Sequence, residues 1–308
     1  MTEFCPGWHP EFASRSRVQF AASGGRFQSA TFGDDARPLP PGFSLSRFRR
    51  WPFDQSVAYG IRGDKIGTCW ENAGTQAFQI HTAADGAFEA VPLSRCMTGW
   101  QGKKLEGGGS PADGGSVLDA FRAMSDPPDG VGCCHEELWP YHPDRRYFAA
   151  GPPDGAVADA GLNRVHGIAD NLAIGDGWKR PIFNSHPVGI GIWWPYGWDT
   201  SVDSTGRATG IGNGQYGHAL AVIGWLDGWD GATWWQIENS HGPIYRVVPS
   251  DIASRIIGYA PAFPDKTHDF WVRDDWMRSV LGYGNAEAIA ATGLTGFKKR
   301  ILDFSDMM

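Results

Sequence analysis

The sequence GTCWENAG (67–74) places a cysteine between a threonine and a tryptophan, at what its pattern predicts to be the start of a helix. Small and apolar residues follow Cys69 at the spacing of one helix face, and polar residues fall on the other face. Thr68-x-x-Glu71 matches a capping box, so we expect the helix to begin at Thr68, with Cys69 as the first helical residue. Backbone N–H groups and the helix dipole favour a thiolate at Cys69. A free cysteine is more often a buried packing residue, however, so the helix pattern alone does not indicate a nucleophile.

The composition is that of an ordinary globular protein of 308 residues, 42% hydrophobic and 20% charged. A formal charge of −7 argues against a nucleic-acid binder. The longest apolar run, near residues 187–198, is too short and too interrupted by proline to span a membrane. The N-terminus shows no signal-peptide pattern, and the arginine- and glycine-rich composition is typical of a GC-rich bacterial or phage genome. We therefore expect a cytoplasmic or virion-associated protein.

The cysteines favour neither a disulfide framework nor a metal site. They are odd in number and scattered, at positions 5, 69, 96, 133 and 134. The neighbours Cys133 and Cys134 cannot easily both converge on one ion, and HEELW (135–139) is not an H-E-x-x-H motif. No metal and no cofactor is expected.

The pattern changes along the chain. Residues 1–38 have little periodicity and predict an arm, whereas SVLDAFRAM (116–124) predicts a short helix with one apolar face. Three β-rich segments follow: PVGIGIWW (187–194), GHALAVIGWLDG (217–228) and TWWQIENS (233–240). Helices first and strands later predict an α+β domain over 39–261, with a helical lobe at about 39–180, a β lobe at about 181–261 and a cleft between them.

Residues 262–308 lie beyond these lobes, and we expect a mainly helical C-terminal extension. An apolar face is expected there because five residues lie at near-helical spacing: Trp271, Trp276, Met277, Val280 and Leu281. We favour docking of this face against its own domain. The alternative is an interface for a protein partner.

Three residues supply complementary chemistry. A thiol nucleophile needs a base, and the base needs an orienting partner. His218 begins one predicted strand and Asn239 ends the next, so adjacent antiparallel strands could place both side chains on one face of the sheet. Alone, His218 is more often a structural histidine and Asn239 a turn residue. Cys69, His218 and Asn239 together, in this order along the chain, indicate a catalytic triad far more specifically than any one of them alone.

Four stretches in order resemble the papain-like cysteine peptidase family, over about residues 39–250. GTCW resembles the nucleophile motif, and DGGSVLDAF (113–121) resembles the Gly-Gly loop and helix beside the substrate. VGCCHEELWPYH (131–142) resembles the Glu-Glu-x-Tyr-Pro-Tyr segment, and GHALAVIGW with WWQIENSHG resembles the histidine and asparagine strands. The resemblance implies a two-lobe α+β fold with a β-barrel-like second lobe.

The resemblance also implies roles for individual residues. Cys69 is the nucleophile, His218 the general base and acid, and Asn239 the residue that holds the imidazole. The substrate cleft is expected to involve three further residues: Gly114, Gly115 and Trp70. The implied activity is that of a cysteine-type peptidase, which attacks a peptide carbonyl of a protein or peptide substrate, forms a thioester and hydrolyses it.

Two departures from the family pattern keep alternatives open. The oxyanion-hole glutamine, usually six residues before the nucleophile, falls on Gly63, so Gln55 is the candidate if the intervening residues loop out. The tryptophan that usually follows Asn-Ser and shields the Asn–His bond is His241 here. One alternative is a structural or binding module, for example in a phage particle, with weak or no catalysis. The other is a Cys–His peptidoglycan hydrolase.

Overall fold

The structure, a computed structural model, describes residues 37–49, 67–85, 92–110, 113–142, 145–195, 198, 201–210, 215–240, 248–261, 269–281 and 286–295. Its first half contains β1 (Gly42–Ser44), the short 3-10 helix η1 (Ser46–Phe48), α2 (Cys69–Ala84), α3 (Arg95–Leu105), α4 (Val117–Ala123), α5 (Arg145–Ala149) and α6 (Ala156–Ala160). The second half contains β2 (Arg164–Ala169), α7 (Asp176–Phe183), β3 (Val188–Pro195), β4 (Gln215–Trp229), β5 (Ala232–Glu238), α8 (Ser250–Ala253), β6 (Asp269–Arg273), α9 (Asp274–Leu281) and β7 (Glu287–Thr295).

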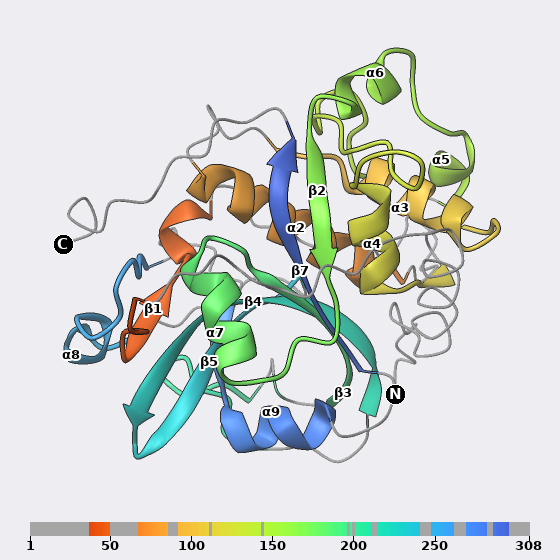
Figure 1. Cartoon of the computed structure of the whole chain (residues 1–308). Coiled ribbons are helices and arrows are strands. Elements are labelled where there is room, and N and C mark those ends of the chain that lie inside the picture. The colour runs from red at the N-terminus through yellow and green to blue at the C-terminus, as the bar shows by residue number, and fades with distance from the viewer. Residues whose placement is uncertain are drawn as a thin grey trace.

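One antiparallel sheet joins both halves of the chain (Figure 1). The strand order is β2-β7-β3-β4-β5-β6, and β1 pairs with β4. Among the described residues β2 and β6 end the order without pairing with each other, so the sheet is open rather than closed like the expected β-barrel-like lobe. Helices packed on an antiparallel sheet confirm the predicted α+β class.

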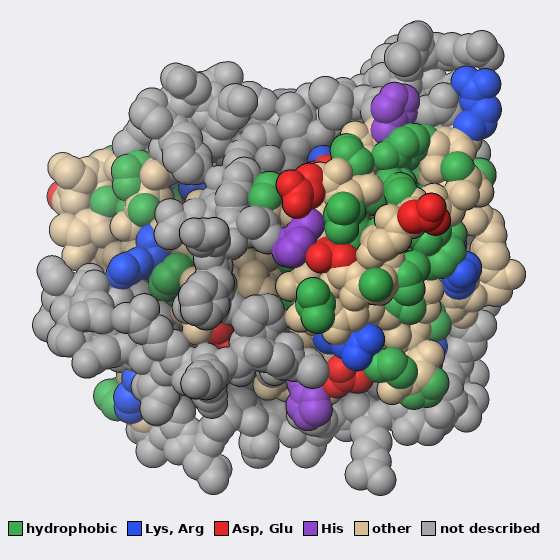
Figure 2. Space-filling model, turned by 90° about the horizontal axis from the view of Figure 1, so that it is seen from above, with side chains coloured by type: hydrophobic (Ala, Val, Ile, Leu, Met, Phe, Trp, Pro, Cys, Tyr) green, Lys and Arg blue, Asp and Glu red, His purple; other side chains and the backbone are tan. Residues whose placement is uncertain are grey.

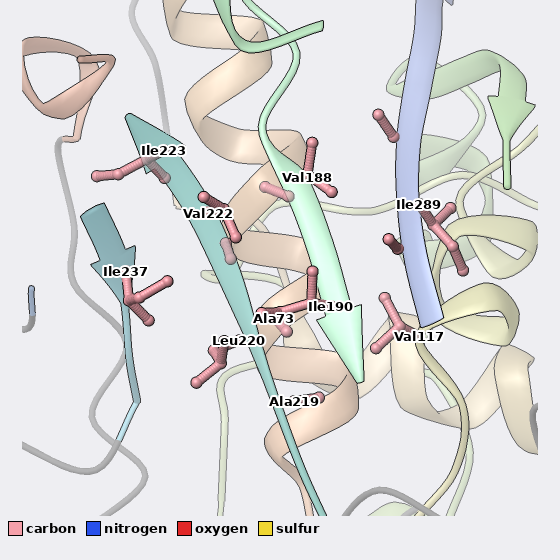
Figure 3. Packing of buried hydrophobic residues seen from close by; sticks show 14 of the residues in the cluster. Ala73, Val117, Val188, Ile190, Ala219, Leu220, Val222, Ile223, Ile237 and Ile289 are labelled. Carbon is pink, nitrogen blue, oxygen red and sulfur yellow. The ribbon is translucent and has the colours of Figure 1, made fainter. Parts of the chain in front are cut away.

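Helix α2 is the central helix of the fold. It contacts β3 and β4 on one side, and α3 and α4 on another. Figure 3 shows Ala73 of α2 within the buried cluster that includes Ile190 of β3 and Val222 of β4. The predicted helix at 116–124 is confirmed as α4, with Val117 and Phe121 buried.

The polar side of α2 is buried as well as its apolar side. Its polar side chains bond to neighbouring elements: Thr75 Oγ1 donates to Thr98 Oγ1 (2.8 Å), and Gln79 Oε1 accepts from the Leu93 N–H (3.1 Å). A buried polar group is costly unless it is hydrogen-bonded, and these contacts offset that cost.

The C-terminal segment corrects the expected division of the chain. Residues 262–308 include β6, which pairs with β5, and β7, which lies between β2 and β3. The buried Glu287 at the start of β7 also accepts the N–H groups of Val117 (2.8 Å) and Leu118 (3.2 Å) at the start of α4. The described part of this segment is therefore integral to the sheet and is not an extension beyond it.

The apolar residues of α9 pack inward, as in the docking interpretation. Met277 and Val280 are buried, and α9 contacts β3, β5 and β6. A partner interface in this segment remains a hypothesis.

The surface seen from above in Figure 2 mixes hydrophobic side chains with acidic, basic and histidine side chains. Large exposed hydrophobic residues in the described part of the chain are Leu138, Val157 and Leu162. Exposed residues of this kind are common on soluble proteins. None of the described helices is both long and apolar enough to cross a membrane.

Candidate active site

Cys69 is the first residue of α2, as predicted, and its side chain is buried. The capping chemistry differs from the predicted box, because the Thr68 side chain makes no cap hydrogen bond. Thr68 Oγ1 instead lies 2.9 Å from the hydroxyl of Tyr141, and Asn72 Nδ2 donates to the Thr68 carbonyl (2.7 Å). The start of the helix is thus held by side chains from its own second turn and from residues 131–142.

The Cys69 sulfur lies against the strand that carries His218. The backbone N–H of Ala219 lies next to it, and so do the N–H groups of Cys69 and Trp70 at the start of the helix. The last β4–β5 pair is Ala221 with Glu238, so Ala219 lies beyond the end of β5, where the start of α2 can approach β4. The structure therefore brings the predicted nucleophile next to the residue that follows the predicted base.

Burial raises the pKa of the Cys69 thiol to about 12, and the nearby Glu71 adds to the rise. The nearby backbone N–H groups lower the pKa but do not outweigh desolvation. This direction is opposite to the predicted thiolate: at neutral pH the buried sulfur in this structure is a thiol. The N–H groups and the dipole at the helix start still favour a thiolate at Cys69, but the exclusion of water from the sulfur disfavours it more strongly.

His218 and Asn239 meet as predicted, across the antiparallel pair β4 and β5. His218 Nε2 lies 2.8 Å from Asn239 Oδ1, and the same oxygen accepts the Ser240 N–H at 2.8 Å. Because an amide oxygen only accepts, Nε2 must carry the proton, and in the neutral ring Nδ1 is then the acceptor. This geometry gives His218 the tautomer that a base toward Cys69 requires.

Aromatic side chains surround the imidazole. Trp194 of β3 meets the His218 ring edge-to-face at a centroid distance of 5.2 Å, and Tyr216 lies at 5.9 Å. Trp198 and Phe270 pack against Trp194 in turn, at 5.1 and 5.8 Å. His218 is 1% exposed and Asn239 3% exposed, so their hydrogen bond is shielded from water.

Sequence reasoning missed Trp194. In the β3–β4 register Ile192 lies opposite His218, which makes Trp194 a diagonal neighbour on the same face. The signal that could have identified Trp194 is the alternation of side chains along PVGIGIWW, which places residues 192 and 194 on the same face of the strand.

The Gly-Gly loop packs on the residue after Cys69. A Cβ added at Gly115 would lie 2.7 Å from the Trp70 indole, and one at Gly102 would also lie 2.7 Å from it. Gly114 has a φ of +84°, which favours glycine. Trp70 is fully buried, so it can affect a substrate cleft only through the glycine loop that it supports. That Gly114, Gly115 and Trp70 belong to a substrate cleft stays a prediction.

Three positions that the sequence analysis singled out are not described by the structure. Gln55, Gly63 and His241 lie outside the described residues. Within the described residues, no group of three or more His, Cys, Asp or Glu side chains is arranged to hold a metal ion.

Comparisons with known proteins agree on the fold. No protein-family model and no curated protein sequence matches the chain. Xylellain, a cysteine protease from Xylella fastidiosa, is similar in structure with a TM-score of 0.60 and 19% identity, over 82% of this chain and 86% of xylellain. Procathepsin B from Trypanosoma congolense gives a TM-score of 0.55 and 15% identity, over 84% of this chain and 79% of that one.

A third similar structure is the proform of the ragweed pollen cysteine protease Amb a 11, with a TM-score of 0.55 and 16% identity, over 91% of this chain and 74% of that one. At these identities the likeness shows the fold alone. The chain has the papain-like cysteine peptidase fold, as its motifs predicted.

Proposed function

We propose that this chain, which has a papain-like fold, is a cysteine-type peptidase that uses Cys69, His218 and Asn239. The observation that carries the proposal is the 2.8 Å contact between His218 Nε2 and Asn239 Oδ1 in a water-excluded position, on the strand whose next residue, Ala219, lies against the Cys69 sulfur. A histidine held in one tautomer next to a thiol is the arrangement that nucleophilic catalysis needs.

The proposed reaction begins with proton transfer from the Cys69 thiol to His218 Nδ1. The sulfur attacks the peptide carbonyl carbon, and the tetrahedral intermediate collapses as His218 returns the proton to the leaving amine. Water, deprotonated by His218, then hydrolyses the thioester and restores the thiol. Because burial raises the pKa of Cys69 to about 12, the sulfur depends on this base for activation.

The oxyanion requires donors near the sulfur. The start of α2 offers backbone N–H groups there, and Gln55 remains our proposal for a side-chain donor. Loss of one oxyanion-hole donor typically costs about 10²–10³ in kcat. Gln55→Ala is expected to show a loss of this size while Cys69 can still be alkylated.

One observation favours a second candidate, a papain-like module with weak or no catalysis. Cys69 is 1% exposed and its pKa is strongly raised by burial, which are properties of a packing cysteine. A Cys–His peptidoglycan hydrolase would use the same residues on another substrate.

Hydrolysis assays separate these functions. Denatured casein and purified cell wall are each incubated with the native chain, with Cys69→Ala, and with Cys96→Ala as a matched control, since Cys96 is another buried cysteine with a raised pKa. The peptidase proposal expects casein cleavage that is lost in Cys69→Ala and retained in Cys96→Ala. Cleavage of cell wall alone supports the hydrolase, and no cleavage of either supports the module.

A further inference from the structure

Helix α2 meets the sheet at two points on one of its faces. At its start, the Cys69 sulfur lies next to the Ala219 N–H of β4. Further along, Gln76 Nε2 donates to Glu238 Oε1 at the end of β5 (3.3 Å). Seven residues are close to two helical turns, so positions 69 and 76 face the same way. Two such contacts restrict both the position and the tilt of the helix.

Glu238 is held from a second direction by a buried ion cluster. Arg49, the residue that ends η1, donates from Nη1 to Glu238 Oε2 at 2.6 Å and lies 2.9 Å from Asp269 Oδ1 of β6. Gln236 Nε2 donates to Asp269 Oδ2 at 2.5 Å, and Ser44 Oγ donates to Gln236 Oε1 at 2.5 Å. Each carboxylate oxygen in the cluster has a partner, and all these side chains are buried.

Glu238 is also the residue immediately before Asn239. Successive side chains of an extended strand point to opposite faces. Thus Glu238 can bond to Arg49 and Gln76 while Asn239 bonds to His218. A movement of the Glu238 backbone would move Asn239 with it.

We propose that Glu238 is a positioning residue that fixes helix α2, through Gln76, against the end of strand β5 and thereby sets the approach of Cys69 to the His218–Asn239 pair. The inference rests on the proposed peptidase function for its catalytic consequence but not for its geometry. Misplacement of reacting groups by about 1 Å can cost on the order of 10²-fold in rate, so such a brace affects chemistry as well as stability.

The first test compares two glutamines of α2. Gln76→Leu removes the contact with Glu238. Gln79→Leu is the matched control, because Gln79 is also buried on α2 but accepts the Leu93 N–H outside the sheet. We expect Gln76→Leu to lower kcat and the rate of Cys69 alkylation by iodoacetamide at least about 10-fold relative to Gln79→Leu, with KM unchanged. Equal losses in the two variants would overturn the proposal.

The second test separates length from charge at position 238. Glu238→Gln keeps the side-chain length: its amide oxygen can accept from Arg49, and its NH₂ can donate to Gln76 Oε1 once the Gln76 amide turns over. Glu238→Asp keeps the charge but is one methylene shorter. We expect the alkylation rate to stay within about 3-fold of the native rate in Glu238→Gln and to fall about 10-fold in Glu238→Asp. Native-like alkylation in Glu238→Asp, measured under conditions where circular dichroism shows it folded, would overturn the proposal.

These outcomes do not depend on peptidase activity. If the native chain cleaves no substrate, the proposed function fails, and the order of the alkylation rates still decides whether Glu238 positions the helix.

Discussion

Two buried glutamates lie beside the candidate site and differ in how they are paired. Glu238, before Asn239, has a partner for each carboxylate oxygen, Arg49 for one and Gln76 for the other. Glu71, two residues after Cys69, is fully buried, and neither of its oxygens has a hydrogen-bond partner within the described structure. The charges around Glu71 are those of Arg95, Lys103 and a second carboxyl, Glu136.

The difference shows how burial acts on the two carboxyls. Burial raises the pKa of Glu71 well above its ordinary value, since Arg95 and Lys103 offset desolvation only partly. Burial also raises the pKa of Glu238, but only to about 7, because Arg49 lies against it. Both carboxylate oxygens of Glu238 are paired, whereas Glu71 is a buried carboxyl whose oxygens have no hydrogen-bond partner within the described structure.

The largest effect is expected from breaking the Arg49 cluster, in which every carboxylate oxygen is paired. Arg49→Met leaves Glu238 and Asp269 buried without their cation, and removing one partner of a buried ion pair costs about 3–5 kcal/mol. Urea unfolding at pH 7 measures the change. Arg273→Met is the control, because the Arg273–Asp275 pair is exposed, and its loss should change stability little. Similar losses of stability in Arg49→Met and Arg273→Met would contradict the distinction between the buried cluster and the exposed ion pair.

A smaller effect of opposite sign is expected at Glu71. Glu71→Leu removes a buried carboxyl without hydrogen bonds and keeps most of its volume, so stability at pH 7.5 should rise by about 1–3 kcal/mol. Because folding raises the pKa of Glu71, the protonated carboxyl favours the folded state. This contribution to stability is fully present below the unfolded-state pKa near 4.5 and is lost as pH rises. The gain should therefore shrink toward pH 4.5. Destabilisation of Glu71→Leu at pH 7.5 would show that the carboxyl has a partner.

A pH dependence of stability is expected at Glu238. Its pKa rises from 4.5 to about 7 on folding, so the native chain should lose stability relative to Glu238→Gln between about pH 4.5 and 7, and level off above that range. Urea unfolding of both proteins at half-unit pH steps measures the difference. A difference that does not change with pH would mean that Glu238 keeps one charge state throughout.

The elements that carry the site could be predicted because each has a strong local pattern. The start of α2 at Cys69 and the antiparallel pairing of β4 with β5 follow from helical spacing and from β-rich segments bounded by turns. The pairing of His218 with Asn239 then follows from the order of those strands.

The burial of the polar face of α2 could not be predicted. Periodicity places Gln76 and Gln79 on the side opposite the apolar face, but it cannot show that α3, α4 and the sheet enclose the helix. For the same reason the raised pKa of Cys69 was missed: a helix start favours a thiolate only where water or a charge partner remains.

The strand β7 was missed for a different reason. Its sequence EAIAATGLT does not alternate, and consecutive residues from Glu287 to Ala291 are buried between β2 and β3. A strand covered on both faces loses the period of two, and its partners lie far away in the sequence.

The central claim is that Cys69 is a nucleophile activated by His218. The most direct measurement is covalent labelling with a peptidyl electrophile near neutral pH, with the modified cysteine mapped by mass spectrometry in the native chain and in His218→Ala. The account predicts a single adduct on Cys69 that forms at least about 100-fold more slowly in His218→Ala, as expected for loss of a general base. Labelling of another cysteine first, or equal rates in both proteins, would contradict it.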